Sequence, residues 1–570
     1  MTVQKSRLEA GATRATRKRH TFNGGIHPDG HKDVSNAAPI VTLPLLSRYV
    51  VPLRQHIGTA TRVLVQAGDT VLRGQMIGAA EGYVSTAVHA PTSGRVVAVE
   101  PHEVPHPSGL ADLCVVIESD GLDQAVEFQP LDWRNLDPSA LRNRIRDLGL
   151  AGLGGAVFPS FIKLNPEGGG IDTLILNGAE CEPWITCDDR LMRERAAEIL
   201  QGVAVMRHML GAREVLIGIE DDKPEAIAAM RTAAGADTGV EVVAVPTLYP
   251  SGGGKQLTYL LTGRETPTGG RSTDVGVQVF NIGTAHALYR AVALGEPMLS
   301  RVVTVTGHVA TPGNYEARLG TPVADLLQAA GGALPGSTGK LVGGPMMGFE
   351  LEDNAAPLTK AVNCIIVKHP DLFPARPAAL PCIRCGACAR ACPADLQPFE
   401  MYWFARAKDF GKAQSYDLFD CIECGCCSFV CPSHIPLVDY FRFAKSEIWE
   451  RERHKHDADQ ARTRHEFKEF RLEREKLEKA EKLAAKVAEN KARDAAAAAT
   501  AAANPDAAAD PEAERKKAIL QAALDRAKKA KEAVTPQNTE SLPPAVEKQI
   551  AEIEARRAQA DTAVEKEAGQ

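Results

Sequence analysis

The sequence contains no run of 18 or more apolar residues, so we expect no helix that spans a membrane. It has no excess of basic residues either, because the formal net charge is −6, and we expect no nucleic-acid partner. Residues 1–20 are polar and basic with no apolar stretch, which predicts a disordered basic tail and no signal peptide. A peripheral role at a membrane is compatible with all three absences.

A regular disulfide framework is also missing. Thirteen cysteines are present, and this usage fits a reducing cytoplasm better than an oxidising compartment. Five of them follow no recognisable spacing: Cys114, Cys181, Cys187, Cys364 and Cys426.

The other eight cysteines form two runs, 382–393 and 421–432, each with the spacing C-x2-C-x2-C-x3-C-P. This is the bacterial pattern for two four-iron clusters, in which the fourth cysteine of each run binds the other cluster. Zinc is the alternative, but zinc sites usually use two C-x2-C pairs. We therefore predict two [4Fe–4S] clusters and single-electron transfer. The first set of ligands is Cys382, Cys385, Cys388 and Cys431, and the second is Cys421, Cys424, Cys427 and Cys392.

The length of 570 residues exceeds what one core supports, so we expect three to five domains. Residues 21–125 are rich in short strands and resemble the half-barrel of biotinyl and lipoyl carrier domains. No lysine occurs between Gly74 and Glu100, so the acceptor lysine of a carrier is missing and the likeness is one of shape. A docking or packing module is the expected role.

The rest of the chain changes character several times. Apolar runs alternate with helical patterns over 126–299, which predicts an α/β domain with buried strands. Residues 300–352 suggest a small β-grasp domain, and 353–380 a Pro- and Ala-rich linker. A helical two-cluster ferredoxin domain is expected at 381–440, followed by a charged, Ala- and Lys-rich tail at 441–570 that is helical or disordered. The fold class is thus multidomain α/β.

Three segments in the α/β domain carry polar groups or glycines in positions suited to a ligand. Residues 148–159 are glycine-rich, 176–183 follow an apolar strand, and 279–285 have the same strand-then-polar-turn form. Ligands of α/β sheets bind beyond the carboxyl ends of strands. The glycine-rich segment is no Rossmann fingerprint, because Val157 stands where the third glycine belongs, and 251–256 is no Walker loop.

Together these segments resemble the flavin-bearing NADH dehydrogenase subunit of respiratory complex I. With residues 22–28, 249–257 and 343–348, and with the two cysteine runs, residues 22–450 look like the C subunit of the Rnf (Rsx) ion-translocating electron-transport complex. The resemblance implies a β-grasp domain of the SLBB type. It also implies a peripheral subunit on the cytoplasmic face of the bacterial inner membrane, whose partners are other membrane and iron–sulfur subunits and, indirectly, ferredoxin.

The resemblance further implies FMN as a cofactor and NADH as the substrate, with ion movement, of Na⁺ or H⁺, coupled to electron transfer. Two positions depart from the complex I pattern: Leu153 replaces an arginine and Ala179 an aspartate. The implied FMN and NADH contacts are Gly152, Gly154, Gly155 and Lys163 for the phosphate and ring, Asn177, Asn281 and Thr284 for polar atoms, Glu180 near the isoalloxazine, and Glu182 and Phe158 for NADH.

The main hypothesis is a subunit that accepts two electrons from NADH through FMN and releases them singly to the clusters, with no side chain acting as catalytic acid or base. One alternative is a flavin-free iron–sulfur relay in a membrane redox complex. A soluble diaphorase is another. The quinone-reductase subunit that shares the scaffold is disfavoured, because that relative lacks the ferredoxin cysteines.

Overall fold

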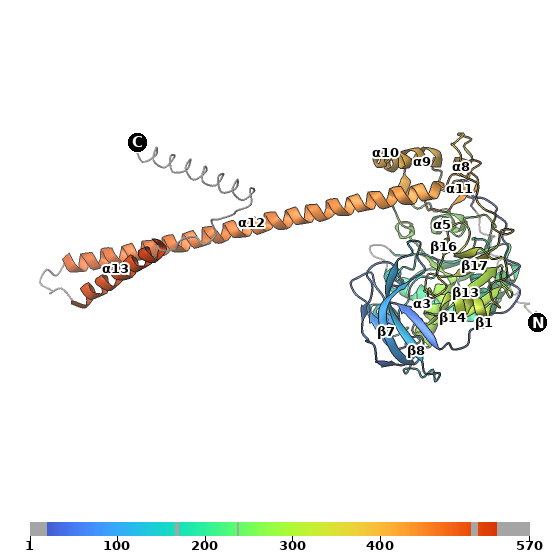
Figure 1. Ribbon diagram of the computed structural model, residues 1–570, viewed down its shortest axis with the longest axis horizontal. Helices are drawn as coiled ribbons and strands as arrows, with labels where there is room; N and C mark the ends of the chain where they lie inside the picture. Colours follow the sequence, from blue (N-terminus) through green and yellow to red (C-terminus); the bar gives the residue numbers. More distant parts are fainter. Residues whose placement is uncertain (1–19, 166–169, 236–238, 503–510, 533–570) are drawn as a thin grey trace, which may run out of the picture. The chain divides into compact units, whose positions relative to one another are not determined.

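The computed structural model describes residues 20–165, 170–235, 239–502 and 511–532 (Figure 1). The expected tail at 1–20 lies outside this part of the chain except for its last residue. The chain divides into two compact units, Met1–Lys455 and His456–Gln570. The first unit holds four structural regions, which follow one another along the sequence. Among the described residues, no helix is both long and apolar enough to cross a membrane.

The first region is a small two-sheet barrel, blue in Figure 1. One antiparallel sheet has the order β2-β8-β7-β4 and the other the order β3-β5-β6. Alternating residues such as Tyr49, Val51 and Ile117 face inward and fill the space between the sheets. The strands are β2 (Arg48–Pro52), β3 (Arg62–Val63), β4 (Thr70–Val71), β5 (Met76–Ala79), β6 (Val88–His89), β7 (Gly94–Glu103) and β8 (Ala111–Ser119).

The second region is an α/β domain around a four-stranded parallel sheet of order β11-β10-β9-β12. Its strands read as near-continuous apolar runs because both faces are covered. One face packs against α1, α3, α4 and α6, and the other against α5. The elements are α1 (Pro138–Asp147), α2 (Ser160–Lys163), β9 (Thr173–Gly178), α3 (Cys187–Leu210), β10 (Glu214–Glu220), α4 (Pro224–Ala234), β11 (Val240–Val245), α5 (Gly254–Thr262), η1 (Ser272–Val275), β12 (Val277–Asn281) and α6 (Ile282–Ala293).

The third region is a six-stranded mixed sheet of order β1-β14-β13-β17-β15-β16, with α7 over it. The parallel pair β13 and β17 lies at its centre, as in a β-grasp fold. The elements are β1 (Val41–Thr42), β13 (Ser300–Gly307), β14 (Gly313–Arg318), α7 (Val323–Ala329), β15 (Gly339–Val342), β16 (Phe349–Leu351) and β17 (Cys364–Lys368).

The structure of residues 353–380 differs from the linker expected there. Its middle forms β17, whose side chains Ile365 and Val367 are completely or almost completely buried in the β-grasp core. The many proline and alanine residues of this segment favour a linker in a prediction from composition, so the short apolar strand is not predicted. Only the part after β17, from 369 to the first cysteine, connects two regions. At the amino-terminal side, β1 pairs with β14 and so joins this sheet rather than the barrel.

The fourth region is helical and carries both cysteine runs. Its core continues beyond the expected boundary at 440, because Phe441, Ala444 and Ile448 pack with Met401 and Leu418. The elements are α8 (Ala387–Arg390), α9 (Pro398–Arg406), α10 (Phe410–Ser415), η2 (Leu418–Asp420), α11 (Cys426–Phe429) and the start of α12 (Leu437–Ala502).

The second unit contains the remainder of α12 and the helix α13 (Pro511–Glu532). Almost all side chains of its described residues are exposed, and these residues take the helical one of the two forms expected for the charged tail. Pairs such as Arg474 with Glu478 lie one turn apart along the helix.

Candidate functional site

A cavity with several polar lining residues lies at the carboxyl ends of β9 and β12, where ligands of such sheets bind. We call it the main cavity. Its volume is about 700 Å³, within the range of cofactor sites. Six of the ten predicted FMN and NADH residues line it: Gly154, Gly155, Asn177, Glu180, Glu182 and Asn281.

The glycine-rich loop forms one wall of the main cavity. The amide of Leu153 donates to Thr284 Oγ1 at 2.9 Å, which ties the loop to the first turn of α6. Gly155 has a φ of +108°, and a Cβ added there would meet no atom of the chain. The loop can therefore present bare backbone to a flat ring. Leu153 supplies an apolar side chain to the wall of the main cavity.

Two asparagines at the ends of β9 and β12 form hydrogen bonds to neighbouring segments that line the main cavity. Asn177 donates to the carbonyl of Gly252 at 2.8 Å and accepts from the amide of Ala179 at 3.1 Å. Asn281 caps α6 by accepting from the amide of Gly283 at 2.8 Å, and it donates to Asp188 at 2.6 Å. These bonds fix both side chains before any ligand binds.

Glu180 and Asp188 form a half-buried acidic pair in the wall of the main cavity. Glu180 accepts from the amides of Asp188 and Asp189, at 2.7 and 3.1 Å, at the start of α3. Burial raises the pKa of Glu180 to about 7, with Lys32 opposing this and Asp188 adding to it. The pKa of Asp188 is also raised, chiefly by burial.

Glu182 connects three parts of the chain. Its Oε1 accepts from the amides of Met346 and Met347, at 2.7 and 3.1 Å, in the loop after β15. A Cβ on Gly344 would lie 2.0 Å from the Cγ of Glu182, so only glycine fits there. Lys32 donates to the carbonyls of Glu180, Glu182 and Ile185 at 2.7–2.9 Å and so holds this turn from outside.

The other four predicted residues do not line the main cavity. Lys163 instead donates to the carbonyl of Val279 and lies 4.4 Å above the ring of Phe280. Burial lowers its pKa to about 8. Lys163 lies at the end of the short helix α2, and its side chain packs against the edge strand β12. The sequence separation between Lys163 and the glycines does not indicate this orientation. Thr284 supports the loop as described, and Gly152 and Phe158 pair with each other through the backbone at 2.8 Å.

Several lining residues come from segments noted only as parts of the resemblance. Gly252, Gly253, Gly254, Lys255 and Gln256 enter from the start of α5, and residues 342–344 and 347–349 from the β-grasp loop. Ile422 and Cys424 of the second cysteine run also line the main cavity. No spacing in the sequence connects a ferredoxin cysteine with a flavin-type pocket.

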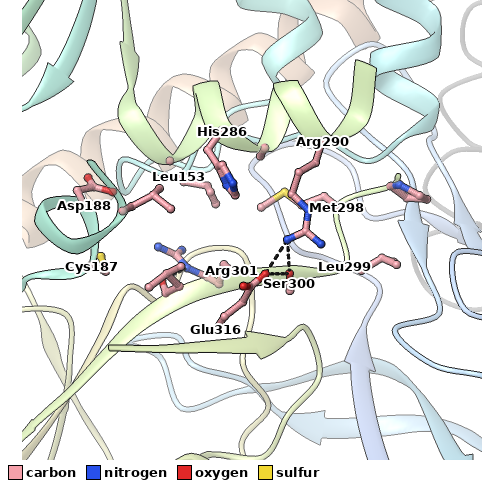
Figure 2. A pocket seen from close by; sticks show the side chains of 15 residues that line it. Leu153, Cys187, Asp188, His286, Arg290, Met298, Leu299, Ser300, Arg301 and Glu316 are labelled. Atoms are coloured by element: carbon pink, nitrogen blue, oxygen red, sulfur yellow. Dashed lines mark hydrogen bonds and ion pairs between the residues drawn. The ribbon is translucent and has the colours of Figure 1, made fainter. Parts of the chain in front are cut away.

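A smaller cavity of about 40 Å³ adjoins the main cavity and shares Leu153, Cys187 and Asp188 with it (Figure 2). Figure 2 shows the guanidinium of Arg290 beside Ser300 and Glu316, to which it donates at 3.1 and 2.6 Å. These bonds join α6 to the β-grasp sheet. The smaller cavity is therefore part of the joint that holds the asparagine-capped helix in place.

The eight predicted cluster cysteines lie in two separate sets around two small hollows. The inner cage consists of Cys392, Cys421, Cys424 and Cys427, and the outer cage of Cys382, Cys385, Cys388 and Cys431. The fourth cysteine of each run thus lines the hollow formed by the other run, as the ferredoxin spacing predicts. Cys426 also borders the inner cage and is completely buried.

The distances between the cysteine sulfurs can be compared with those around a zinc ion. Four thiolates around one zinc ion lie about 3.8 Å apart, given the Zn–S bond length. Among the described residues, a single group has three possible metal-ligand atoms within 4.8 Å of one another. It consists of Glu180, Cys187 and Asp188. No three of the cage sulfurs lie within that distance of one another.

The inner cage shares Cys424 with the main cavity, whereas none of the four outer-cage cysteines lines it. Tyr249 borders the main cavity and donates its hydroxyl to the carbonyl of Cys424 at 2.6 Å. In the inner cage, Cys392, Cys424 and Cys427 are buried. In the outer cage, Cys385 is exposed and Cys382 and Cys431 are partly so.

Family models match the four regions in the order observed. The RnfC barrel sandwich hybrid domain matches residues 20–122, the Nuo51 FMN-binding domain 145–290, the SLBB domain 302–350, and the 4Fe-4S dicluster domain 381–435. Fold and site thus define a flavin- and iron–sulfur-binding oxidoreductase component.

Curated relatives identify one family within this class of oxidoreductase components. A protein of Haemophilus influenzae (strain 86-028NP), named as the C subunit of an ion-translocating oxidoreductase complex, is 46% identical over 80% of this chain and 69% of its own length. Relatives of the same name in Erwinia tasmaniensis and Citrobacter koseri are 49% and 47% identical over 81% of this chain, and over 58% and 66% of their own lengths. The chain belongs to this family, the RnfC family of ion-translocating oxidoreductase complexes, and is a component of a multisubunit complex.

Among solved structures, an NAD⁺-reducing [NiFe]-hydrogenase in its air-oxidised state is similar over 49% of this chain and 54% of its own, with 23% identity and a TM-score of 0.37. The same enzyme type in the H2-reduced state gives 20% identity and a TM-score of 0.39 over 51% of this chain and 60% of its own.

Proposed function

We propose that this chain takes electrons from NADH through FMN in the main cavity and passes them singly to two [4Fe–4S] clusters, first in the inner cage and then in the outer cage. The observation that carries this order is the shared wall: Ile422 and Cys424 line the main cavity, and Cys424 also lines the inner cage. A donor and an acceptor on the two sides of Cys424 are separated by little more than that residue.

The residues around the main cavity fit FMN. Bare backbone at Gly154 and Gly155 admits a flat ring, and Asn177 and Asn281 offer amide groups at the strand ends. Bound FMN would exchange two electrons with a nicotinamide and one at a time with a cluster. The chain itself would bind and orient FMN, and Tyr249 would link the cavity wall to a cluster ligand.

Two predicted contacts need another role in this proposal. Lys163 is engaged with Val279 and Phe280, so it serves the sheet edge rather than a phosphate. Glu182 holds the loop of Met346 and Met347, which forms part of the wall of the main cavity. We propose that Glu182 shapes the nucleotide side of the main cavity through this loop.

We also propose that the chain attaches peripherally to the cytoplasmic face of the membrane through other subunits of the complex. Its family membership supports this, since the relatives are named as subunits of an ion-translocating complex.

An anaerobic titration of the purified full chain with NADH tests the main proposal. Loss of flavin absorbance, followed by EPR signals of two reduced clusters, is the expected result. Iron–sulfur absorbance that does not respond to NADH would instead support a flavin-free relay, to which the apolar Leu153 and the distant Lys163 lend some support.

A further inference from the structure

The two cysteine runs are equivalent in spacing but not in surroundings, and the difference indicates where electrons leave the chain. Ile422 lies between the first two cysteines of the second run and borders the main cavity. Ile383 has the same place in the first run and is 68% exposed. The position that faces the proposed donor on the inner side thus faces solvent on the outer side.

The loops of the two runs are covered to different extents. A Cβ on Gly425 would lie 2.8 Å from the carbonyl of Met346, so the second run packs closely against the β-grasp loop. The equivalent Gly386 meets only Arg390 of its own run, at 3.2 Å. Cys385 is exposed beside it.

Charge also separates the runs. Arg384 and Arg390 are exposed in the first run, and Arg390 donates to the carbonyl of Cys385 at 3.2 Å. Neither forms an ion pair within the described part of the chain. The equivalent positions of the second run hold Glu423, which pairs with Arg442 and Lys445, and Phe429. The outer cage is therefore rimmed by two unneutralised guanidinium groups.

An exposed apolar residue completes the rim. The amide of Leu380 donates to the carbonyl of Ser433 at 2.9 Å, and Ser433 lines the hollow of the outer cage. Leu380 is 59% exposed. An apolar centre with charged neighbours is typical of small, transient electron-transfer interfaces.

We propose that Leu380, Ile383, Arg384 and Arg390, here called the exit rim, dock an acidic redox protein or domain that exchanges electrons with the outer cage. The proposal rests on the proposed function for the presence of a cluster in the outer cage, but it does not depend on NADH or on FMN. Opposite charge would steer the encounter, and exposed Cys385 and Ile383 would bring the two redox centres close.

The test uses the full chain with its clusters and a photoreduced acidic [2Fe–2S] ferredoxin of the plant type as the probe. Stopped-flow absorbance measures the second-order rate of cluster reduction in the absence of nucleotide. Arg384→Glu combined with Arg390→Glu should lower this rate about tenfold or more at low salt, and the deficit should shrink as salt screens the charges. A matched double reversal on the barrel, Arg62→Glu with Arg95→Glu, should leave the rate unchanged.

An apolar variant tests the centre of the rim. Ile383→Ser should lower the rate several-fold at all salt concentrations, whereas Leu122→Ser, equally exposed on the barrel side of the chain, should not. Iron content and the EPR spectrum after dithionite show whether each variant keeps its clusters. Should a rim variant lose them, the wild-type protein still decides. Its rate of cluster reduction by ferredoxin must fall as salt rises. The rate at which basic ferricytochrome c oxidises its dithionite-reduced clusters must not fall.

Equal rates for the rim and barrel variants would overturn the proposal. So would a rim variant that changes only the oligomeric state, because the rim would then join two copies of the chain. A wild-type protein that accepts electrons from ferredoxin but not from NADH would contradict the proposed function and leave the exit rim intact.

Discussion

The inner and outer cages have the same cysteine spacing, yet their surroundings differ almost residue by residue. Around the inner cage, Tyr249 and the carbonyl of Met346 contact the second run. The charge of Glu423 is balanced there by Arg442 and Lys445. Around the outer cage, the equivalent arginine and isoleucine are open to solvent. A duplicated motif can thus have one enclosed copy and one solvent-facing copy without any change in its cysteine spacing.

Removal of a crossed ligand should have the largest effect. Cys392→Ser changes the first run but should abolish the cluster of the inner cage, because Cys392 lines the hollow formed by the second run. Iron analysis and EPR of dithionite-reduced protein should show one cluster signal lost. Cys426→Ser is the matched control, since Cys426 is buried beside the same hollow and is no predicted ligand. Loss of the outer signal alone would show that the ligation is not crossed.

The ion pairs of Glu423 in the second run give the next effect. In Glu423→Gln, the buried Lys445 keeps its bond to the carbonyl of Cys421 but loses its carboxylate. An uncompensated buried cation costs about 1–3 kcal/mol, so chelator should strip the inner cluster about tenfold faster. Arg384→Gln, at the equivalent exposed position, should leave chelation of the outer cluster unchanged. Similar rates for both variants would contradict the difference between the runs.

The shared wall predicts a kinetic effect on the inner side. Tyr249→Phe removes the hydroxyl that donates to the carbonyl of Cys424. Reduction of the inner cluster by NADH should slow about 3- to 10-fold, corresponding to the loss of about one hydrogen bond. Flavin reduction, followed separately by absorbance, should stay at the wild-type rate. Tyr259→Phe, in the neighbouring helix α5, provides the control. An unchanged cluster rate would remove Tyr249 from the proposed path.

The sequence predicts the ferredoxin runs and the strand ends well, because cysteine spacing and Asn177 or Asn281 after apolar strands depend on local chain geometry. It does not predict where Lys163 points, since that follows from how α2 packs under β12. Nor does it predict that β17 completes the β-grasp sheet or that Cys424 borders the main cavity. Those features arise from contacts between segments that are not adjacent in the sequence, for which local patterns contain no information.

A pH dependence confined to the inner side should be the smallest effect. The pKa of Glu180 is raised to about 7 by burial, so its native form binds a proton that the unfolded chain releases near pH 4.5. Its contribution to stability is therefore present at low pH and falls as the pH rises towards 7.

Above pH 7 the ionised Glu180 adds negative charge beside the main cavity and should lower the flavin potential by about a few tens of millivolts beyond the ordinary pH slope. Spectroelectrochemistry between pH 5.5 and 8.5 measures this inflection. In Asp188→Asn, which keeps an oxygen for Asn281, the inflection should move to lower pH because a neighbouring negative charge is gone. The outer cluster, far from this pair along the proposed path, should show no inflection in either protein. An inflection at the outer cluster that moves with Asp188→Asn would show that the two sides are not electrostatically separate.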